Sequence, residues 1–409
     1  GGGGYNYHHD RRLSSQRVVS EEEWEERGGG GPSGGGTSGN GPNASRMAAV
    51  PQHSEDLPSD SSVGRDDSVG HFRGGPGTVI RDRYSVVKDV GMGTFGRVVQ
   101  CMDGKTGEAV AIKIVRNVRR YHESALIEAD ILRDINSRKD GRGRTLCVQL
   151  LDRFDHGGHC CLVFEKLGMS LYDFLKGHEY QPFPLFCVRD FSQQLLEALE
   201  FMHGMNLIHT DLKPENILLC DNTEVEYRVR DGVVRMVPRS TQIKVIDFGG
   251  ATYNHEKKSS VINTRQYRAP EVILQLGWST PSDLWSLGCI IAELYRGELL
   301  FATHDNIEHL ALIESCISPF PQRMLLNTSC SVASHAFGKN GRHKRGSVLS
   351  ASSMSHVRKM KGIHDVVRGE DRGSGIEGLL RNLLVIDPDL RASARQALEC
   401  RFCQERNGL

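Results

Sequence analysis

Long hydrophobic runs are missing from this sequence, and none of its apolar stretches approaches the ~18 residues that a membrane-spanning helix needs. No apolar segment follows basic residues near the start, so we expect no secretory signal. Because the chain starts at Gly1 rather than at a methionine, we expect it to be a fragment. A net charge of one sign is also missing, since 51 basic side chains balance 51 acidic ones. The molecule as a whole is therefore no polyanion binder, and any charged surface must be local.

A disulfide framework is missing too, because the 11 cysteines are scattered and odd in number. This pattern favours a reducing compartment, the cytosol or the nucleus. Cys400 and Cys403 form a single C-x-x-C pair without two further zinc ligands close in sequence. We therefore interpret this pair as packing residues rather than as a metal site.

Large apolar side chains are scarce in two segments. Residues 1–78 hold mainly Gly, Ser and charged residues, which cannot bury enough surface to offset chain entropy, so we predict a disordered tail. Residues 320–375 are rich in Gly, Ser, Arg and Lys, and we predict a loop there. Its basic cluster RHKR, at 342–345, is interpreted as solvated, with a nuclear signal or an RNA contact as the alternative.

The segment HTDLKPEN, at 209–216, places an acid, an ammonium group and a carboxamide between two apolar runs. It matches the protein-kinase catalytic loop H-R-D-L-x-x-x-N, except that Thr210 replaces arginine. In such a loop Asp211 would orient the proton of a substrate hydroxyl, and Lys213 would neutralise charge on the phosphoryl group. Asn216 would hold a Mg²⁺ ion. The alternative is a polar loop with a capped turn.

A second signal is GMGTFGRVV, at 91–99, which lies between two strand-like runs. A dinucleotide-binding G-x-G-x-x-G would open a helix, whereas this one leads into β-branched residues and then into the strand VAIKIV at 110–115. That order is typical of the nucleotide-covering half of a kinase, in which glycines let the backbone approach phosphate groups. The residues expected to contact ATP in this half are Gly91, Met92, Gly93, Thr94, Phe95, Gly96, Val98, Ala111 and Lys113.

Residues 123–135 have apolar side chains at helical spacing, and Glu128 lies on that stripe. A buried carboxylate needs a partner, and we expect Lys113 to be that partner, because kinases pair these two groups to position the phosphates. A surface pair within the helix is the alternative. Strands are expected at 148–154 and 160–164, followed by a link between lobes where adenine would meet backbone groups. The residues expected to contact the nucleotide there are Phe164, Glu165 and Leu167.

The second half of the chain is mainly helical in pattern, with helices expected at 171–175, 185–203 and 283–295. A hairpin is expected where alternating runs at 225–229 and 233–237 flank an Asp-Gly pair.

Three charged residues in this half have expected partners. A short strand ends in the triplet DFG, whose Asp247 is expected to bind Mg²⁺ together with Asn216. Asp283 is unusual in an apolar helix, and we expect backbone donors of the catalytic loop to satisfy it. Arg391 is expected to form a buried ion pair with Glu271.

Seven motifs in this order resemble those of a eukaryotic protein kinase over residues 84–405. The resemblance implies an α+β, bilobal fold with a disordered N-terminal tail. The small β-rich N-lobe with its hinge would span 84–168, and the large helical C-lobe would span 169–405.

Within the CMGC group of kinases, the chain resembles the LAMMER, or CDC-like, family. NTRQYRAPE at 263–271 resembles a segment shared by cyclin-dependent, MAP and CDC-like kinases. The name motif of the family is EHLAMMER, whereas residues 308–315 read EHLALIES, so the apolar face is kept and the last arginine is Ser315. Further matching segments are HTD at 209–211, FGGATY at 248–253, LGWS at 276–279 and THD at 303–305.

The resemblance implies a dual-specificity enzyme that uses ATP and Mg²⁺, autophosphorylates on tyrosine and phosphorylates Ser/Arg-rich splicing factors on serine and threonine. It implies a nuclear protein that is also present in the cytoplasm. We expect a monomer without direct nucleic-acid binding and without membrane contact. Two departures count against arginine-rich docking: the tail is Gly-rich rather than Arg/Ser-rich, and NHEKK at 254–258 is less acidic than in many relatives.

Two alternatives stay open. A pseudokinase scaffold is one; the altered Ser315 favours it, and the intact set of catalytic residues named above counts against it. A DYRK-like or other CMGC kinase with different substrates is the second, although the activation segment has no Tyr-x-Tyr. Because Thr210 carries no charge to pair with a phosphate, we hypothesise that activity does not require phosphorylation of the activation segment.

Overall fold

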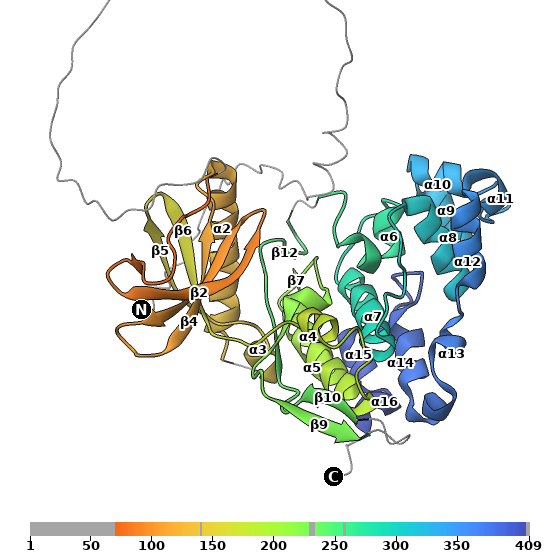
Figure 1. Ribbon diagram of the computed structural model, residues 1–409. Coiled ribbons are helices and arrows are strands. Elements are labelled where there is room, and N and C mark those ends of the chain that lie inside the picture. Colours follow the sequence, from red (N-terminus) through yellow and green to blue (C-terminus); the bar gives the residue numbers. More distant parts are fainter. Residues whose placement is uncertain (1–69, 140, 229–233, 257–258, 406–409) are drawn as a thin grey trace, which may run out of the picture.

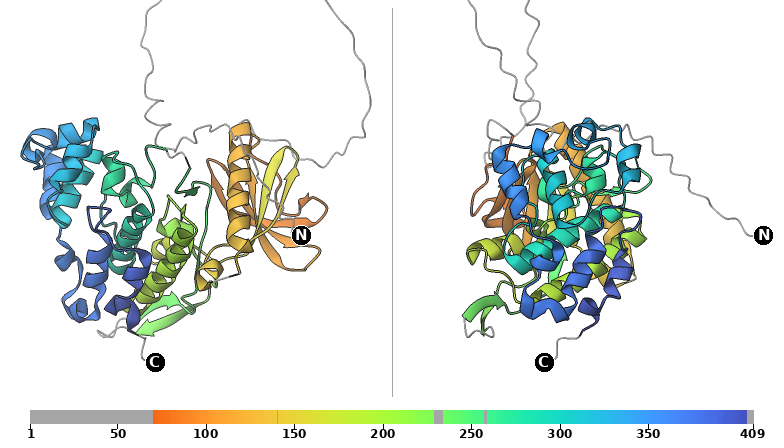
Figure 2. Two further views of the ribbon diagram at one scale, coloured as in Figure 1. Left: turned by 180° about the vertical axis from the view of Figure 1, so that it is seen from behind. Right: turned by 90° about the vertical axis from the view of Figure 1, so that its right-hand side faces the viewer.

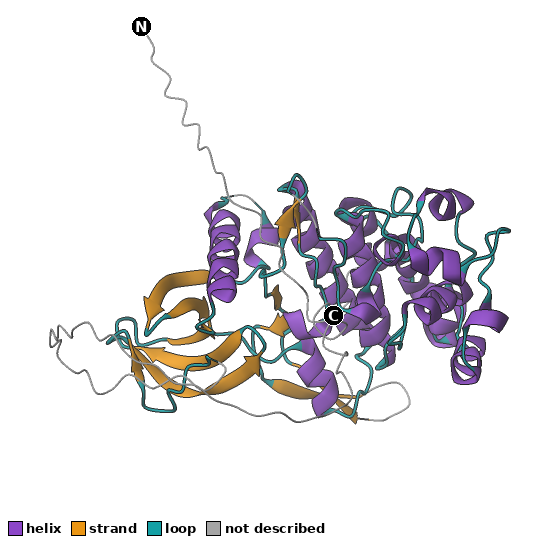
Figure 3. Ribbon diagram, turned by 90° about the horizontal axis from the view of Figure 1, so that it is seen from above, coloured by secondary structure: helices purple, strands orange, loops and turns teal. Residues whose placement is uncertain are grey.

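The computed structural model describes residues 70–139, 141–228, 234–256 and 259–405 (Figure 1). These residues form a small lobe dominated by strands and a large lobe dominated by helices, and the large sheet lies at one end of the molecule, with a few short strands among the helices (Figure 3). Most of the predicted disordered tail lies outside the described residues. Within the described part of the chain, no helix is both long and apolar enough to cross a bilayer.

The small lobe is built on one antiparallel sheet with the strand order β1-β2-β3-β4-β6-β5. The strands are β1 Val79–Ile80, β2 Tyr84–Gly93, β3 Gly96–Asp103, β4 Ala109–Val115, β5 Leu150–His156 and β6 His159–Glu165. Helix α2, Arg119–Ser137, lies along this sheet (Figure 2) and buries Ala125, Ala129 and Leu132. The strands and the helix predicted for this lobe are confirmed. β5 begins and ends two residues later than predicted, and the other elements are longer than predicted at one end or both.

Packed structure begins before Tyr84, where we predicted the domain to start. Phe72 and Ile80 are buried in the core of the small lobe. Arg97 of β3 donates hydrogen bonds to the carbonyl oxygens of Phe72 and Gly74. Residues 70–78 are therefore packed against the small lobe, and assigning them to the disordered tail was wrong, because one aromatic anchor held by backbone contacts leaves no periodic pattern in the sequence.

The large lobe is organised around α5, Leu185–Gly204, and α7, Pro281–Arg296, both of which are buried along most of their length. The other elements are α3 Arg142–Thr145, α4 Leu171–Gly177, β7 Leu207–Ile208, η1 Pro214–Asn216, β8 Ile217–Leu219, β11 Ile243–Val245, β12 Thr252–Tyr253, η2 Arg265–Tyr267, α6 Pro270–Ile273, α8 Asn306–Cys316, α14 Ile376–Leu383, α15 Ala394–Leu398 and α16 Arg401–Gln404. Short antiparallel pairings join β8 to β11 and β7 to β12. These pairings bring the segment at 209–216 next to the DFG triplet.

The predicted hairpin is confirmed in its strands. β9, Glu224–Arg228, pairs antiparallel with β10, Val234–Pro238. The Asp-Gly turn predicted between them lies outside the described residues.

The prediction of a loop at 320–375 was wrong. The segment forms α9 Gln322–Asn327, α10 Ser331–Ala336, α11 Arg345–Val348, α12 Ala351–Lys359, α13 Ile363–Val366 and η3 Gly369–Ser374. Helices α9 to α12 gather around α8 (Figure 1). The few apolar residues of the segment, among them Met324, Phe337 and Val357, are buried in the core that the segment shares with α8.

Helix α8 carries the stretch that departs from the LAMMER motif, and both of its carboxylates are engaged by this segment. Glu314 accepts a hydrogen bond from Arg345 at 2.7 Å. Glu308 accepts one from Ser353 at 2.8 Å and lies 2.6 Å from Nδ1 of His356. Since Arg345 belongs to the predicted basic cluster, the interpretation of that cluster as freely solvated was also wrong.

Candidate active site

Asp283 of α7 binds the backbone of the catalytic-loop segment. This fully buried carboxylate accepts hydrogen bonds from the backbone nitrogens of His209, at 2.9 Å, and Thr210, at 3.0 Å. Nε2 of His203 lies 3.0 Å from it. A buried charge requires such partners, so the predicted role of Asp283 is confirmed. Thr210 has a φ of 71°, a left-handed conformation that a β-branched residue rarely adopts, and the bonds to Asp283 help to hold it there.

Asp211 has a carboxylate that neighbouring groups already orient. Its Oδ1 accepts hydrogen bonds from the backbone nitrogen of Thr264, at 3.0 Å, and from its hydroxyl, at 2.8 Å. Its Oδ2 lies 2.9 Å from Nζ of Lys213, and 32% of the Asp211 side chain is exposed. Burial opposes the charge of Lys213, yet the carboxylate of Asp211 raises the pKa of Lys213 above its ordinary value. The loop therefore holds the accessible carboxylate of Asp211 in a fixed position, next to a Lys213 side chain that stays positively charged.

Lys113 of β4 lies between two carboxylates from other elements. Its Nζ is 2.9 Å from Oε2 of Glu128 on α2 and 3.2 Å from Oδ1 of Asp247. Burial acts to lower the pKa of Lys113, but the two carboxylates raise it above its ordinary value. The positive charge of Lys113 in turn lowers the pKa of Asp247. The predicted pair of Lys113 and Glu128 is confirmed, and it joins α2 to the sheet.

Asn216 and Asp247 come together because β8 and β11 are paired. The side-chain nitrogen of Asn216 donates to the carbonyl oxygen of Asp211 at 2.9 Å, so the amide oxygen is the atom that can bind a cation. Asp247 has a φ of 62°, a conformation that is uncommon outside glycine and is found at functional sites, and 44% of its side chain is exposed. Carboxylate and amide oxygens are ligands that suit Mg²⁺. Both residues therefore fit the predicted metal.

The glycine hairpin has the predicted form, with Gly91 opposite Val98 and Gly93 opposite Gly96. A Cβ atom on Gly91 or Gly93 would meet no atom within 4 Å, so these two positions leave space for a phosphate group. A Cβ atom on Gly96 would lie 2.4 Å from the carbonyl oxygen of Ile114. The close approach of β4 therefore requires Gly96 to be a glycine, which is a different reason from the predicted one.

The tip of this hairpin is open to solvent. Met92, Thr94 and Phe95 are exposed. The ring of Phe95 meets that of Tyr121 on α2 edge-on, with 5.3 Å between ring centroids, and the carbonyl oxygen of Thr94 accepts a hydrogen bond from Arg116. In this conformation Phe95 is thus in contact with α2.

The predicted binding site for the adenine ring lies where β4 and β6 pair. Ala111 lies opposite Phe164 in the register of these strands, and Phe164 and Leu167 are buried. The carboxylate of Glu165 accepts a hydrogen bond from Lys244 at 2.6 Å. The side chain of Glu165 is therefore engaged within the protein, and its backbone nitrogen donates to the carbonyl oxygen of Gln149.

Thr264 is the site residue that the sequence reasoning missed. It lies within the segment 263–271 that was quoted for the family resemblance, but no role was assigned to it. Its contacts to Asp211 and Lys213 arise from the fold of the activation segment and leave no local pattern.

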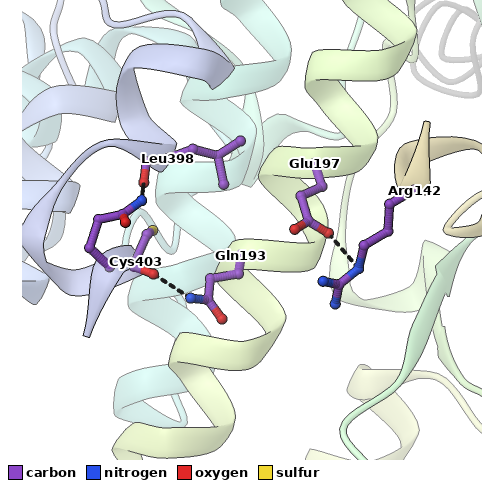
Figure 4. A pocket seen from close by; sticks show the side chains of 6 residues that line it. Arg142, Gln193, Glu197, Leu398 and Cys403 are labelled. Atoms are coloured by element: carbon purple, nitrogen blue, oxygen red, sulfur yellow. Dashed lines mark hydrogen bonds and ion pairs between the residues drawn. The ribbon is translucent and has the colours of Figure 1, made fainter. Parts of the chain in front are cut away.

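A separate hollow lies on the large lobe, away from the residues described above (Figure 4). It is lined by Arg142, Gln193, Glu197, Leu398, Cys403 and Gln404. Two interactions cross its wall: Arg142 forms an ion pair with Glu197 at 3.0 Å, and Gln193 donates to the carbonyl oxygen of Cys403. Cys403 is buried, in keeping with its interpretation as a packing residue.

Known proteins share this sequence and fold. The family described as "Protein kinase domain" matches residues 84–403. Serine/threonine-protein kinase AFC2 of Arabidopsis thaliana is 44% identical over 351 residues, which are 83% of this chain and 81% of that protein. Dual specificity protein kinase CLK2 of Homo sapiens is 49% identical over 265 residues, which are 64% of this chain and 53% of that protein.

A solved structure agrees with these relatives. A crystal structure of a kinase domain is 39% identical in sequence and covers 83% of this chain and 100% of its own, with a TM-score of 0.76. The chain therefore belongs to the LAMMER, or CDC-like, family of protein kinases.

Proposed function

We propose that this kinase phosphorylates serine and threonine within arginine-rich protein segments, such as those of Ser/Arg-rich splicing factors, and that it autophosphorylates on tyrosine. ATP with Mg²⁺ supplies the phosphoryl group when bound. Asp211 orients the substrate hydroxyl and draws off its proton, and Lys213 offsets negative charge beside it. Lys113, fixed by Glu128, would position the phosphates, and Asn216 with Asp247 would hold the metal.

The observation that carries the choice of substrate is the state of Glu215 on the catalytic loop. Its Oε2 atom is buried and has no hydrogen-bond partner among the described residues. Burial raises the pKa of Glu215, and the carboxylates of Asp211 and Asp173 add to the effect. A buried oxygen without a partner is unfavourable. Because Glu215 as a whole is only partly buried, a rotation of its side chain would present the carboxylate to an arginine of the substrate, which would satisfy it with charge-assisted hydrogen bonds. The loop therefore favours substrates that carry arginine near the phosphorylated residue.

The test compares phosphate transfer from Mg-ATP to an Arg-Ser repeat peptide and to a Ser-Pro peptide, with Asp211→Asn as the inactive control. We expect a preference for the Arg-Ser peptide. The matched variant Glu215→Gln should raise KM for that peptide and leave KM for ATP unchanged. Transfer to the Ser-Pro peptide alone would point to another CMGC kinase, and retained ATP binding without transfer would point to a scaffold.

The proposal includes the place and state in which the enzyme acts. Splicing factors are nuclear, so we propose that the kinase works as a monomer in the nucleus, with a fraction in the cytoplasm. Imaging of a fluorescent fusion and light scattering of the purified chain test these two statements. A fusion excluded from the nucleus, or a stable dimer, would contradict them.

A further inference from the structure

Three potential metal ligands meet outside the active site, between α2 and the hairpin of β5 and β6. Asp155 and Cys160 are direct partners in the antiparallel register of these strands, so their side chains share one face of the sheet. Helix α2 packs on β5 and β6 and carries His122. The ligand atoms of the three residues all lie within 4.8 Å of one another, and Nε2 of His122 is 3.9 Å from Oδ1 of Asp155.

Strand alternation separates this cluster from the neighbouring cysteine. Successive residues of a strand point to opposite faces, so Cys160 faces α2 and belongs to the core beneath that helix. Cys161 points the other way and packs with Phe154 in the core of the small lobe. The chain therefore provides a matched control, a buried cysteine one residue away that cannot reach His122.

We propose that His122, Asp155 and Cys160 bind one zinc ion, with water as the fourth ligand, and that the ion fastens α2 to the sheet. Imidazole nitrogen, carboxylate oxygen and thiolate sulfur are the zinc ligands of proteins, whereas Mg²⁺ prefers oxygen ligands alone. Around a tetrahedral zinc the ligand atoms lie about 3.3–3.8 Å apart. The separation of 3.9 Å between His122 and Asp155 is close to this spacing. Because His122 is only partly buried and Asp155 is exposed, we expect their side chains to rotate toward Cys160 when the ion binds.

Proton and charge balance are consistent with this site. Zinc binding breaks the S–H bond, forms a Zn–S bond and releases the proton to solvent. The thiolate and the Asp155 carboxylate then neutralise the two charges of the ion. Arg153 lies beside the thiol, and its positive charge opposes the cation, so we expect weaker binding than in a four-ligand structural site.

The site has a mechanical consequence for the kinase fold. His122 lies about one and a half helical turns before Glu128 on α2. An ion that ties His122 to the sheet holds this end of α2 against β5 and β6. It thereby holds the pair of Glu128 and Lys113 together. This inference rests on the fold alone and is independent of the proposed substrates.

The experiment titrates the metal-stripped, full chain with Co²⁺ and Zn²⁺, with Mg²⁺ as the control ion. We expect one Co²⁺ per chain with a thiolate-to-metal charge-transfer band that Zn²⁺ removes and Mg²⁺ does not. Zn²⁺ at 100 times its Kd should raise Tm by about 4 °C and slow amide hydrogen exchange in α2. His122→Ala, Asp155→Asn and Cys160→Ser should each abolish these effects.

Control variants decide between this cluster and the other thiols of the chain. Cys161→Ser, Cys220→Ser and Cys400→Ser should leave the Co²⁺ band and the rise in Tm intact. Since His122 and Asp155 are not buried, their variants should fold even where Cys160→Ser does not. A band that survives His122→Ala, a band lost only in Cys400→Ser, or a chain without any stoichiometric metal would each overturn the proposal.

Discussion

The guanidinium of Arg391 binds both carboxylate oxygens of Glu271, at 2.7 and 2.9 Å, and neither side chain is accessible to solvent. The pair joins the end of the activation segment to a loop of the distant C-terminal region, as the sequence predicted. Arg391 also lies over the ring of Trp285 in α7. The pair therefore stabilises the large lobe by connecting two segments that are distant in the sequence.

Arg391→Ala should lower the free energy of unfolding by ~3–5 kcal/mol, because it leaves the Glu271 carboxylate buried without a partner. The kcat of the fraction that remains folded should change far less. Urea denaturation and steady-state kinetics on the same sample check both statements. Arg395→Ala is the matched control, since that side chain is 80% exposed. An unchanged unfolding transition in Arg391→Ala would refute the prediction.

Thr264→Val should lower kcat by about 10-fold or more, because it removes the hydroxyl that donates to Asp211 and accepts from Lys213. KM for ATP should stay the same, since Thr264 lies on the side of the substrate hydroxyl. Thr264→Ser keeps the hydroxyl and should restore the rate. Equal rates for the valine and serine variants would show that the hydroxyl does not orient Asp211.

Phosphatase treatment should leave kcat within about twofold of the untreated enzyme. The activation segment is already held by Asn263, whose backbone and side-chain nitrogens both donate to the carbonyl oxygen of Thr210, at 3.0 and 2.8 Å. Asn263→Asp removes the side-chain donor and should lower kcat in both samples. Loss of activity after complete dephosphorylation, verified by mass spectrometry, would contradict this prediction.

Glu293 should make stability fall as the pH rises. It is 5% exposed, accepts a hydrogen bond from Tyr267 at 2.6 Å, and burial raises its pKa to about 7. In the unfolded chain glutamate has a pKa of about 4.3. Between this pH and about pH 7 the unfolded chain therefore binds fewer protons at this residue than the folded chain does. Stability from Glu293 is thus complete at low pH and is lost as the pH rises to about 7.

The neutral isostere Glu293→Gln isolates this effect. It should be more stable than the native chain at about pH 8, by up to about 3 kcal/mol, with a smaller difference at about pH 5. Urea denaturation at both values measures the two differences. Glu298→Gln, whose side chain is 62% exposed in the native chain, should change neither. A pH dependence that is the same in Glu293→Gln and in the native chain would assign it to other groups.

The active site was largely predictable from the sequence because its parts are local. Asp211, Lys213 and Asn216 have fixed spacing within one loop, and a strand end delivers Asp247. The partner of Lys113 was predictable because a carboxylate on an apolar stripe needs a counter-charge. The set of residues expected to contact the nucleotide, which includes Val98 and Leu167, stays a prediction.

The remaining features depend on contacts between distant segments. Met324 and Phe337 have no regular spacing, and they are buried because α8 lies beneath them, so the segment at 320–375 looked like a loop. The cluster at His122 escaped notice for the same reason: its ligands come from a helix and from two strands, and no spacing in the sequence links them. Gly96 was predicted to contact the nucleotide, whereas the close approach of β4 that requires a glycine at this position is visible only in the fold.

Helix α8 and the segment at 320–375 form one interacting unit that has to be kept together in a chimeric protein. The carboxylates of Glu308 and Glu314 are bound by His356, Ser353 and Arg345, so a chimera that replaces the segment at 320–375 alone leaves both carboxylates without these partners. Chimeras of this kinase and its relatives should therefore exchange the whole stretch from Asn306 to the end of η3, so that the interacting residues stay together.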